Sequence, residues 1–197
     1  TLKDLQKAVM DNKADIGIAF DGDGDRAGLV DETGTIRNSD QTLLLLAIDH
    51  LSRHPGASVV HTVSASGILK SEIERLGGKP VMCKVGHSNV EHAMQDSHSL
   101  LGGETSGHLF CGEGYYHFDD ACVAALRILM ILKNGGKPLS AHFADFPKTY
   151  QMPPLRPYTP DDVKGKIVTD SIEHFSKKYP TETMDGARID FGDNAWA

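Results

Sequence analysis

Cysteine is scarce in this chain of 197 residues: Cys83, Cys111 and Cys122 are the three present, and none of them has C-x-x-C spacing. An odd number of isolated cysteines suggests neither a disulfide framework nor a zinc knuckle. Long apolar runs are also missing, since no stretch approaches the roughly 18 residues that a membrane-spanning helix needs. No signal peptide is visible either. We therefore expect a cytoplasmic protein without a membrane partner.

Basic residues are in deficit, with 20 Lys and Arg against 27 Asp and Glu and a formal net charge of −7. A general nucleic-acid binder shows a basic face instead, so nucleic acid is excluded as the expected partner. A small anionic ligand is not excluded, because a local arginine or a bound metal can outweigh the average charge.

Apolar periodicity predicts alternating strands and helices. Helices are predicted over residues 2–12, 39–53, 66–78, 88–97, 119–136 and 162–180, with Ser39 or Asp40 as the cap of the second. Strands are predicted over 14–20, 27–36 with a turn at Thr33-Gly34, 57–63, 79–85 and 99–104, and a hairpin turning at Gly192-Asp193-Asn194. This alternation indicates an α/β fold with a mixed, mainly parallel sheet and flanking helices. Four of the nine prolines fall in residues 148–162, which we expect to connect two domains.

The segment IAFDGDGDRAGLV places Asp21, Asp23 and Asp25 at alternate positions, and Arg26 follows at once. A solvated turn accounts for one or two aspartates but poorly for three. A calcium loop would put Glu32 at its twelfth position, yet its sixth position, where glycine is needed, is Arg26. A divalent-cation site at a phosphoryl-transfer centre fits best, because carboxylates converge on a hard cation and arginine binds phosphate oxygens.

A second motif, GGETSGH, offers Glu104 as an acceptor, Ser106 as donor and acceptor, and His108 as a titratable group. Sugar hydroxyls need that mixture of groups. The heptapeptide alone is more typical of a Gly-Ser turn in which the Glu and the His are incidental. The loop VGHS adds His87, for which backbone bonding and a functional role are about equally favoured.

Together DGDGDR, GHSNV and GETSGH, in this order, make the chain resemble the α-D-phosphohexomutase family, the phosphomannomutases and phosphoglucomutases. The resemblance implies an intramolecular phosphotransferase of the isomerase class, which interconverts hexose 1-phosphate and hexose 6-phosphate of mannose, glucose or both. It acts through a phosphoserine enzyme and a bisphosphate intermediate, with hexose 1,6-bisphosphate as activator. The implied Mg²⁺ ligands are Asp21, Asp23 and Asp25. The implied substrate-binding residues are Arg26, His87, Glu104, Ser106 and His108, of which Arg26 and His108 are also catalytic.

The resemblance further implies that residues 1–36 end domain 2 of that family, 37–150 form domain 3, and 151–197 begin domain 4. The chain has no T-[AG]-S-H-N-P-like loop for the nucleophile and no phosphate-binding loop of domain 4. We therefore expect an inactive fragment whose domain 1 and remaining domain 4 belong to the same polypeptide.

Two departures leave the substrate open. Thr105 stands where related sugar loops carry methionine or glutamine, and Ser64 stands where some dual-specificity members carry lysine. Phosphoglucosamine mutase is thus an alternative. A non-catalytic calcium- or sugar-binding module and a phosphatase of the haloacid-dehalogenase type, with an aspartate nucleophile, are the alternatives from other classes.

Overall fold

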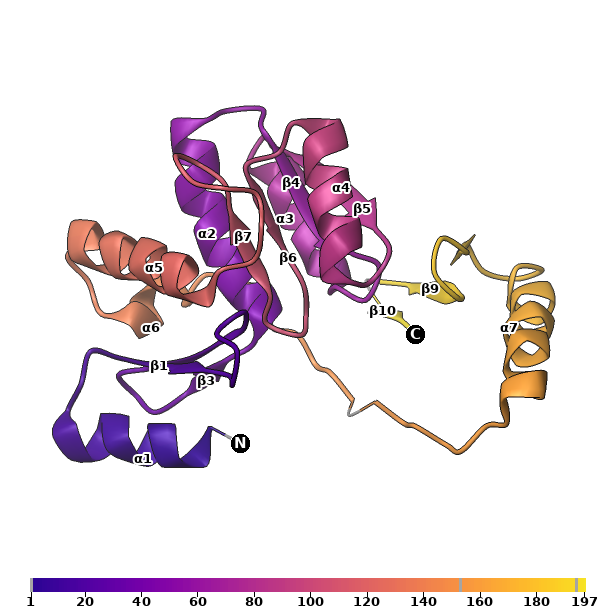
Figure 1. Ribbon diagram of the computed structural model, residues 1–197, viewed down its shortest axis with the longest axis horizontal. Helices are drawn as coiled ribbons and strands as arrows, with labels where there is room; N and C mark the ends of the chain where they lie inside the picture. Colours follow the sequence, from indigo (N-terminus) through magenta and orange to yellow (C-terminus); the bar gives the residue numbers. More distant parts are fainter. Residues whose placement is uncertain (1, 153, 194) are drawn as a thin grey trace. The chain divides into compact units, whose positions relative to one another are not determined.

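A computed structural model describes residues 2–152, 154–193 and 195–197 (Figure 1). The chain divides into two compact units, Thr1–Phe146 and Pro147–Ala197. Among the described residues, no helix is long and apolar enough to cross a membrane.

The first unit begins with a helix on a small antiparallel sheet of order β1-β2-β3. Its elements are α1 (Lys3–Asn12), β1 (Ile16–Phe20), β2 (Ala27–Asp31) and β3 (Ile36–Arg37). Gly17 of β1 lets the helix approach, because a Cβ there would stand 2.5 Å from Cγ2 of Val9. The predicted helix, strands and turn are confirmed.

A buried ion pair closes the turn between β2 and β3. Asp31 is fully buried, and its Oδ2 accepts hydrogen bonds from Arg37, including one from Nε at 2.8 Å. Its Oδ1 accepts from the backbone N–H groups of Thr33 and Thr35, each at 3.0 Å. Burial alone would raise the pKa of Asp31, but these bonds and the charge of Arg37 outweigh it and lower that pKa.

The rest of the first unit is an α/β/α layer structure around a four-stranded sheet of order β5-β4-β6-β7. Its elements are α2 (Ser39–Arg53), β4 (Ser58–Thr62), α3 (Gly67–Arg75), β5 (Lys79–Cys83), α4 (His87–Ser97), β6 (Leu101–Gly103), β7 (Leu109–Cys111), α5 (Ala121–Gly135) and α6 (Leu139–His142). Strand β4 pairs in parallel with β5 and β6, whereas β7 runs antiparallel to β6. The predicted mixed, mainly parallel sheet is confirmed.

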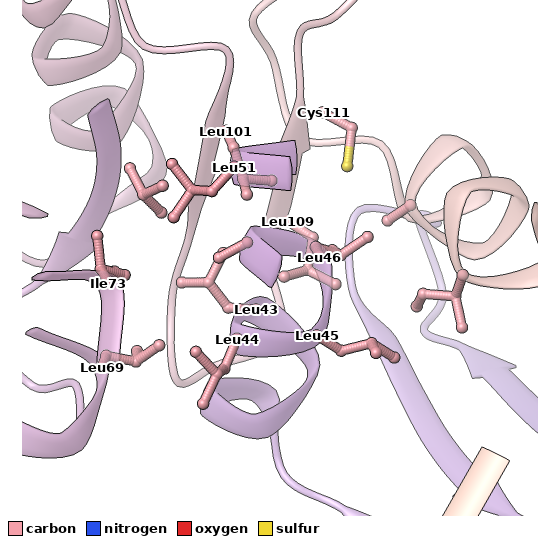
Figure 2. Packing of buried hydrophobic residues seen from close by; sticks show 14 of the residues in the cluster. Leu43, Leu44, Leu45, Leu46, Leu51, Leu69, Ile73, Leu101, Leu109 and Cys111 are labelled. Carbon is pink, nitrogen blue, oxygen red and sulfur yellow. The ribbon is translucent and has the colours of Figure 1, made fainter. Parts of the chain in front are cut away.

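Alternating side chains fill a core on each face of this sheet. Val59 and Leu109 belong to the larger core, which α2, α3 and α5 complete (Figure 2). Their neighbours Val60 and Phe110 point to the other face and pack with residues of α4. This period of two is what a strand buried on both faces requires.

Three details differ from the sequence predictions. Helix α2 is capped by Asn38, whose side chain accepts from Gln41 N at 2.9 Å, and not by Ser39 or Asp40. The carboxylate of Asp40 instead accepts from Ser66 N at 2.8 Å. Strands β7 and β8 and helix α6 were not predicted, because elements this short carry no periodic pattern.

The second unit holds helix α7 (Asp161–Phe175) and a sheet of order β10-β9-β8. Its strands are β8 (Thr181–Glu182), β9 (Arg188–Gly192) and β10 (Ala195–Trp196). The predicted helix is confirmed, and so is the antiparallel pairing of the last two strands. Asn194 of the predicted turn lies outside the described residues. The guanidinium of Arg188 stacks on the ring of Trp196, 3.8 Å from its centroid.

Candidate active site

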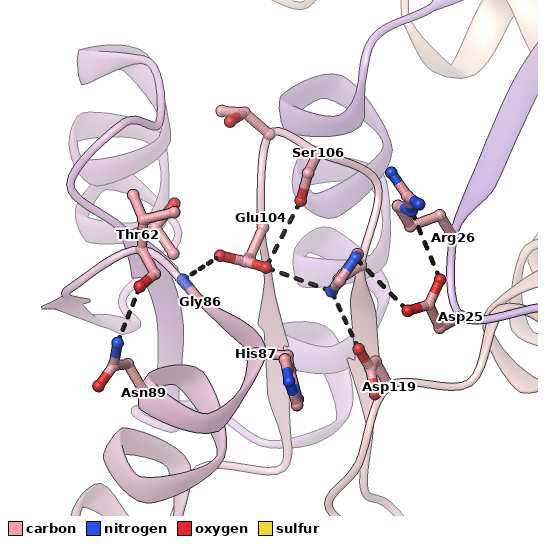
Figure 3. Close-up of polar contacts among 12 residues, drawn as sticks. Asp25, Arg26, Thr62, Gly86, His87, Asn89, Glu104, Ser106 and Asp119 are labelled. Carbon is pink, nitrogen blue, oxygen red and sulfur yellow. Dashed lines mark hydrogen bonds and ion pairs between the residues drawn. The ribbon is translucent and has the colours of Figure 1, made fainter. Parts of the chain in front are cut away.

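The motif residues gather where strands of the four-stranded sheet end (Figure 3). Glu104 follows β6, and Gly86 and His87 follow β5 and open α4. In α/β sheets, ligands bind at the carboxyl ends of the strands. The acidic loop that follows β1 reaches the same place.

Within the acidic loop, Arg26 donates hydrogen bonds to Asp21. Oδ1 of Asp21 accepts from the backbone N–H groups of Gly24 and Arg26, each at 3.2 Å, and Oδ2 accepts from Arg26 Nε at 2.5 Å. Desolvation alone would raise the pKa of Asp21, but the bonds and charge of Arg26 prevail and lower it. Asp21 is therefore held as a carboxylate.

The three aspartates can share one cation. Each offers an oxygen, and these oxygens lie within 4.8 Å of one another. Asp23 is exposed to solvent. Oδ1 of Asp25 is buried without a hydrogen-bond donor among the described residues, although Arg26 Nε lies 3.4 Å away. Carboxylate oxygens are the donors that Mg²⁺ prefers, so the residues present fit that ion.

Glu104 is the buried anchor of the second loop, with a side chain only 4% exposed. Its Oε1 accepts from Gly86 N at 2.8 Å, which joins the GGETSGH segment to the loop after β5. Its Oε2 lies 3.5 Å from Ser106 Oγ and 3.3 Å from His108 Nδ1 (Figure 3). Gly86 has a φ of +118°, a backbone conformation that favours glycine.

His108 lies between the carboxylates of both loops. Its Nδ1 is 3.0 Å from Asp119 Oδ2, and its Nε2 is 3.7 Å from Asp25 Oδ2. Sequence reasoning missed Asp119, because an Asp-Asp pair before a helix indicates only a cap. The cap is Asp120, whose Oδ1 accepts from Cys122 N and Val123 N. Asp119 is free to face the histidine from the bridge that it forms with Phe110.

The two loops are joined through their backbones. Arg26 and His108 form an antiparallel bridge, and Ala27 N donates to Gly107 O at 3.2 Å. Gly107 has a φ of +105°, and a Cβ there would stand 3.4 Å from Ala27 O. Glycine at this position therefore permits the close approach of the two chains.

His87 and Thr105 lie at the margin of this group. The ring of His87 is 6.3 Å from that of His108, centroid to centroid, and its side chain is 60% exposed. Oγ1 of Thr105 is 3.1 Å from Ser64 Oγ, so these two departures from the related motifs face each other. The structure thus brings every predicted site residue to one region and adds Asp119.

The geometry contradicts the calcium-loop alternative. Both Oε atoms of Glu32 accept hydrogen bonds from Ser140, one of them from its backbone N at 3.0 Å. The carboxylate of Glu32, which would have been the twelfth-position calcium ligand, is thus already hydrogen-bonded to Ser140 at the start of α6. Strands also flank the acidic segment on both sides, whereas an EF-hand loop joins two helices.

Comparisons with known proteins agree with this arrangement. Residues 38–150 match the family model "Phosphoglucomutase/phosphomannomutase, alpha/beta/alpha domain III", and residues 1–34 match that of domain II. A phosphomannomutase/phosphoglucomutase from Pseudomonas putida is 40% identical over 197 residues, which cover 99% of this chain and 42% of that protein. A phosphoglucosamine mutase from Nitratidesulfovibrio vulgaris is 43% identical over 134 residues, which cover 67% of this chain and 30% of that protein.

The crystal structure of a phosphoglucomutase/phosphomannomutase family protein from Burkholderia thailandensis is also similar, with a TM-score of 0.86 and 34% identity. The match covers 98% of this chain and 41% of that one. This chain spans about two fifths of the length of the curated relatives that match nearly all of it. The domain boundaries at residues 36 and 150 stay predictions. The matched models and the relatives show that the chain belongs to the phosphoglucomutase/phosphomannomutase family.

Proposed function

We propose that this chain supplies the metal-binding and sugar-binding loops of a phosphohexomutase that interconverts hexose 1-phosphate and hexose 6-phosphate. The observation that carries the proposal is the backbone junction between the acidic loop and the Glu104 loop. Metal carboxylates and hydroxyl-binding groups side by side are what transfer of a phosphoryl group to a sugar hydroxyl requires. Glucose and mannose phosphates are the proposed substrates.

Asp21, Asp23 and Asp25 would hold Mg²⁺, because their oxygens converge and Oδ1 of Asp25 lacks a donor among the described residues. When bound, that ion neutralises charge on the transferring phosphoryl group. Arg26 already lies beside two of these carboxylates, so its guanidinium is placed to bind phosphate or sugar oxygens.

Glu104 and Ser106 would bind sugar hydroxyls. Among the described residues, the contacts of Glu104 Oε2 with His108 Nδ1 and Ser106 Oγ are long, at 3.3 and 3.5 Å, so this oxygen keeps capacity to accept a hydroxyl. Oδ2 of Asp119 lies 3.0 Å from His108 Nδ1 and would orient the ring through that contact, so that Nε2 could take or give a proton at the hydroxyl. His87 would line the same region.

The complete reaction needs two further parts, a phosphorylated serine and a grip on the distal phosphate. The proposal assigns the serine to domain 1 and the distal phosphate loop to domain 4, together with a bisphosphate intermediate and a hexose 1,6-bisphosphate activator. The 197 residues alone are therefore expected not to turn over. A cytoplasmic location belongs to the same proposal, because the three cysteines are free and reducing compartments keep thiols unpaired.

The test is a segment exchange. Residues 1–197 replace the matching segment of the Pseudomonas putida relative, which is 40% identical, and formation of glucose 6-phosphate from glucose 1-phosphate is followed with Mg²⁺ and the bisphosphate. We expect turnover in the exchanged enzyme and its loss on Asp23→Asn. The exposed His92→Ala serves as the matched control. A folded exchanged enzyme without turnover on any hexose phosphate would refute the assignment.

Glucosamine phosphate is the second candidate substrate, because a phosphoglucosamine mutase matches 67% of the chain at 43% identity. The Thr105–Ser64 contact would set the choice, since it joins the hydroxyl of Ser64 to a residue of the Glu104 loop. The exchanged enzyme should be assayed on glucosamine 1-phosphate beside the glucose and mannose substrates. A kcat/KM highest for glucosamine 1-phosphate would favour this alternative.

A further inference from the structure

A second cluster of ligand groups lies where α2 ends and the chain leaves β7. His50 is in the last turn of α2, His54 is its C-cap residue, and Glu113 follows β7 by two residues. We call these three residues the His50 cluster. It shares no residue with the acidic loop or the Glu104 loop, and the proposed phosphohexomutase reaction does not use it.

The spacing of the cluster suits a metal ion. One ligand atom from each residue lies within 4.8 Å of the other two. His54 Nε2 is 2.9 Å from Glu113 Oε1, and His50 Nδ1 is 3.7 Å from Glu113 Oε2. Two ligands bound tetrahedrally at about 2.1 Å stand about 3.4 Å apart. Small side-chain rotations would bring all three atoms to that spacing.

His50 is unusual as a buried imidazole. The residue is only 4% exposed, and its Nε2 has no hydrogen-bond partner among the described residues. Its Nδ1 points to Glu113 from beyond hydrogen-bond distance. Burial, followed by the nearby His54, lowers the pKa of His50.

The third ligand carries the negative charge. Hydrogen bonding to Arg53 is the largest effect on Glu113 and lowers its pKa to about 2. The side chains of His54 and Glu113 are 40% and 29% exposed, so an ion can reach them from solvent. Two imidazoles and a carboxylate suit zinc and neighbouring first-row ions, whereas Mg²⁺ prefers oxygen ligands.

Arg53 competes for the same carboxylate. Its NH1 contacts Glu113 Oε1, while its NH2 is 2.7 Å from Asp49 Oδ2. The ion pair with Asp49 gives Arg53 a second partner one helical turn away. Arg53 can therefore leave Glu113 to an incoming cation without becoming an unpaired charge.

We propose that His50, His54 and Glu113 form a binding site for Zn²⁺ or a similar first-row transition-metal ion, separate from the Mg²⁺ site. Three protein ligands leave a further position for water. A bound ion would tie the segment after β7 to the end of α2, a connection that Arg53 and His54 make in this structure.

The experiment titrates Zn²⁺ calorimetrically into the chelator-treated chain of residues 1–197, in excess Mg²⁺ to occupy the acidic loop. We expect about one Zn²⁺ per chain. His54→Ala and Glu113→Gln should each weaken binding by at least about tenfold, since even an outer-shell change costs that much. His92→Ala, an exposed histidine of α4, should bind like the parent.

The Arg53→Gln variant distinguishes a metal-binding site from a cluster that is held together by hydrogen bonds and ion pairs alone. Removing the competing cation should tighten Zn²⁺ binding, although it also removes an ion pair of the folded chain. Co²⁺ added to the parent should give visible absorption that disappears in His54→Ala, with circular dichroism showing that the variant is folded. The proposal fails if the parent binds no Zn²⁺, if His54→Ala and Glu113→Gln bind like the parent, or if only Asp23→Asn removes binding.

Discussion

Glu104→Gln tests the buried anchor of the Glu104 loop with the smallest possible change. The substitution keeps the shape of the side chain and exchanges an anionic oxygen for an amide N–H₂. The glutamine oxygen can still accept from Gly86 N, which is 2.8 Å from Oε1 of the glutamate. The amide nitrogen would then face His108 and Ser106, which lie 3.3 and 3.5 Å from Oε2.

The expected magnitude follows from these contacts. A hydrogen bond to a charged group is worth about 1.5–3 kcal/mol, against about 0.5–1.5 for a neutral pair. With 4% of the side chain exposed, water cannot replace what is lost. The free energy of unfolding of the chain should therefore fall by about 1–3 kcal/mol. In the complete enzyme, weaker transition-state binding by roughly 1.5–3 kcal/mol corresponds to an about 10- to 150-fold lower kcat/KM.

Urea unfolding of the 197-residue chain measures the first effect, and steady-state kinetics of the exchanged enzyme measure the second. Glu74→Gln on the exposed face of α3 makes the same chemical change as a control and should alter neither. If Glu104→Gln keeps the parental kcat/KM for every hexose phosphate tested, Glu104 does not bind the sugar. An unchanged free energy of unfolding would refute the anchor argument itself.

Three further predictions concern the acidic loop and the buried ion pair. Asp23→Asn in the exchanged enzyme should lower turnover strongly, because it removes an anionic ligand of the metal, and the electrostatic stabilisation that the metal supplies is typically worth about a few kcal/mol. Asp31→Ala should lower the free energy of unfolding by about 3–5 kcal/mol, since it leaves Arg37, only 15% exposed, without its partner. Because the pKa of Asp31 is lowered in the folded state, its contribution to the free energy of unfolding is complete above its ordinary pKa of about 4. That contribution is lost as the pH falls through the folded-state pKa.

Each of these has a measurement that can contradict it. Parental turnover of Asp23→Asn at saturating Mg²⁺ would exclude Asp23 as a ligand. Urea unfolding of Asp31→Ala at neutral pH should be compared with that of the exposed Asp11→Ala; equal losses would refute the buried-pair argument. Stability measured between neutral and acid pH should fall less steeply for Asp31→Ala than for the parent, and parallel curves would contradict the pKa assignment.

Most of the fold could be predicted because its elements are periodic over many residues. Helices α2 and α5 each run for 15 residues, which is long enough for an apolar face to stand out. Strand β7 has three residues and depends on its partner β6. The cap of α2 was misplaced by one or two positions because Asn, Ser and Asp follow one another, and each can cap.

The residues of the candidate site could be predicted from the sequence only where they lie together in one short motif. The alternate aspartates and the GETSGH segment are readable because each motif is contiguous. Asp119 reaches His108 through its bridge with Phe110, and Asp31 is buried by a turn whose sequence looks solvated. Such contacts arise from tertiary packing, so no short window of the sequence reports them.

The bridge between Arg26 and His108 has a mechanical consequence. Hydrogen bonds from Ala27 N to Gly107 O and from Ala121 N to Gly24 O join the acidic loop to the loops that carry Glu104 and Asp119. Separating these loops would break backbone hydrogen bonds of the folded unit, so we expect the loops to move together. The spacing between the carboxylates of the two loops is therefore set when the chain folds, before any ligand binds.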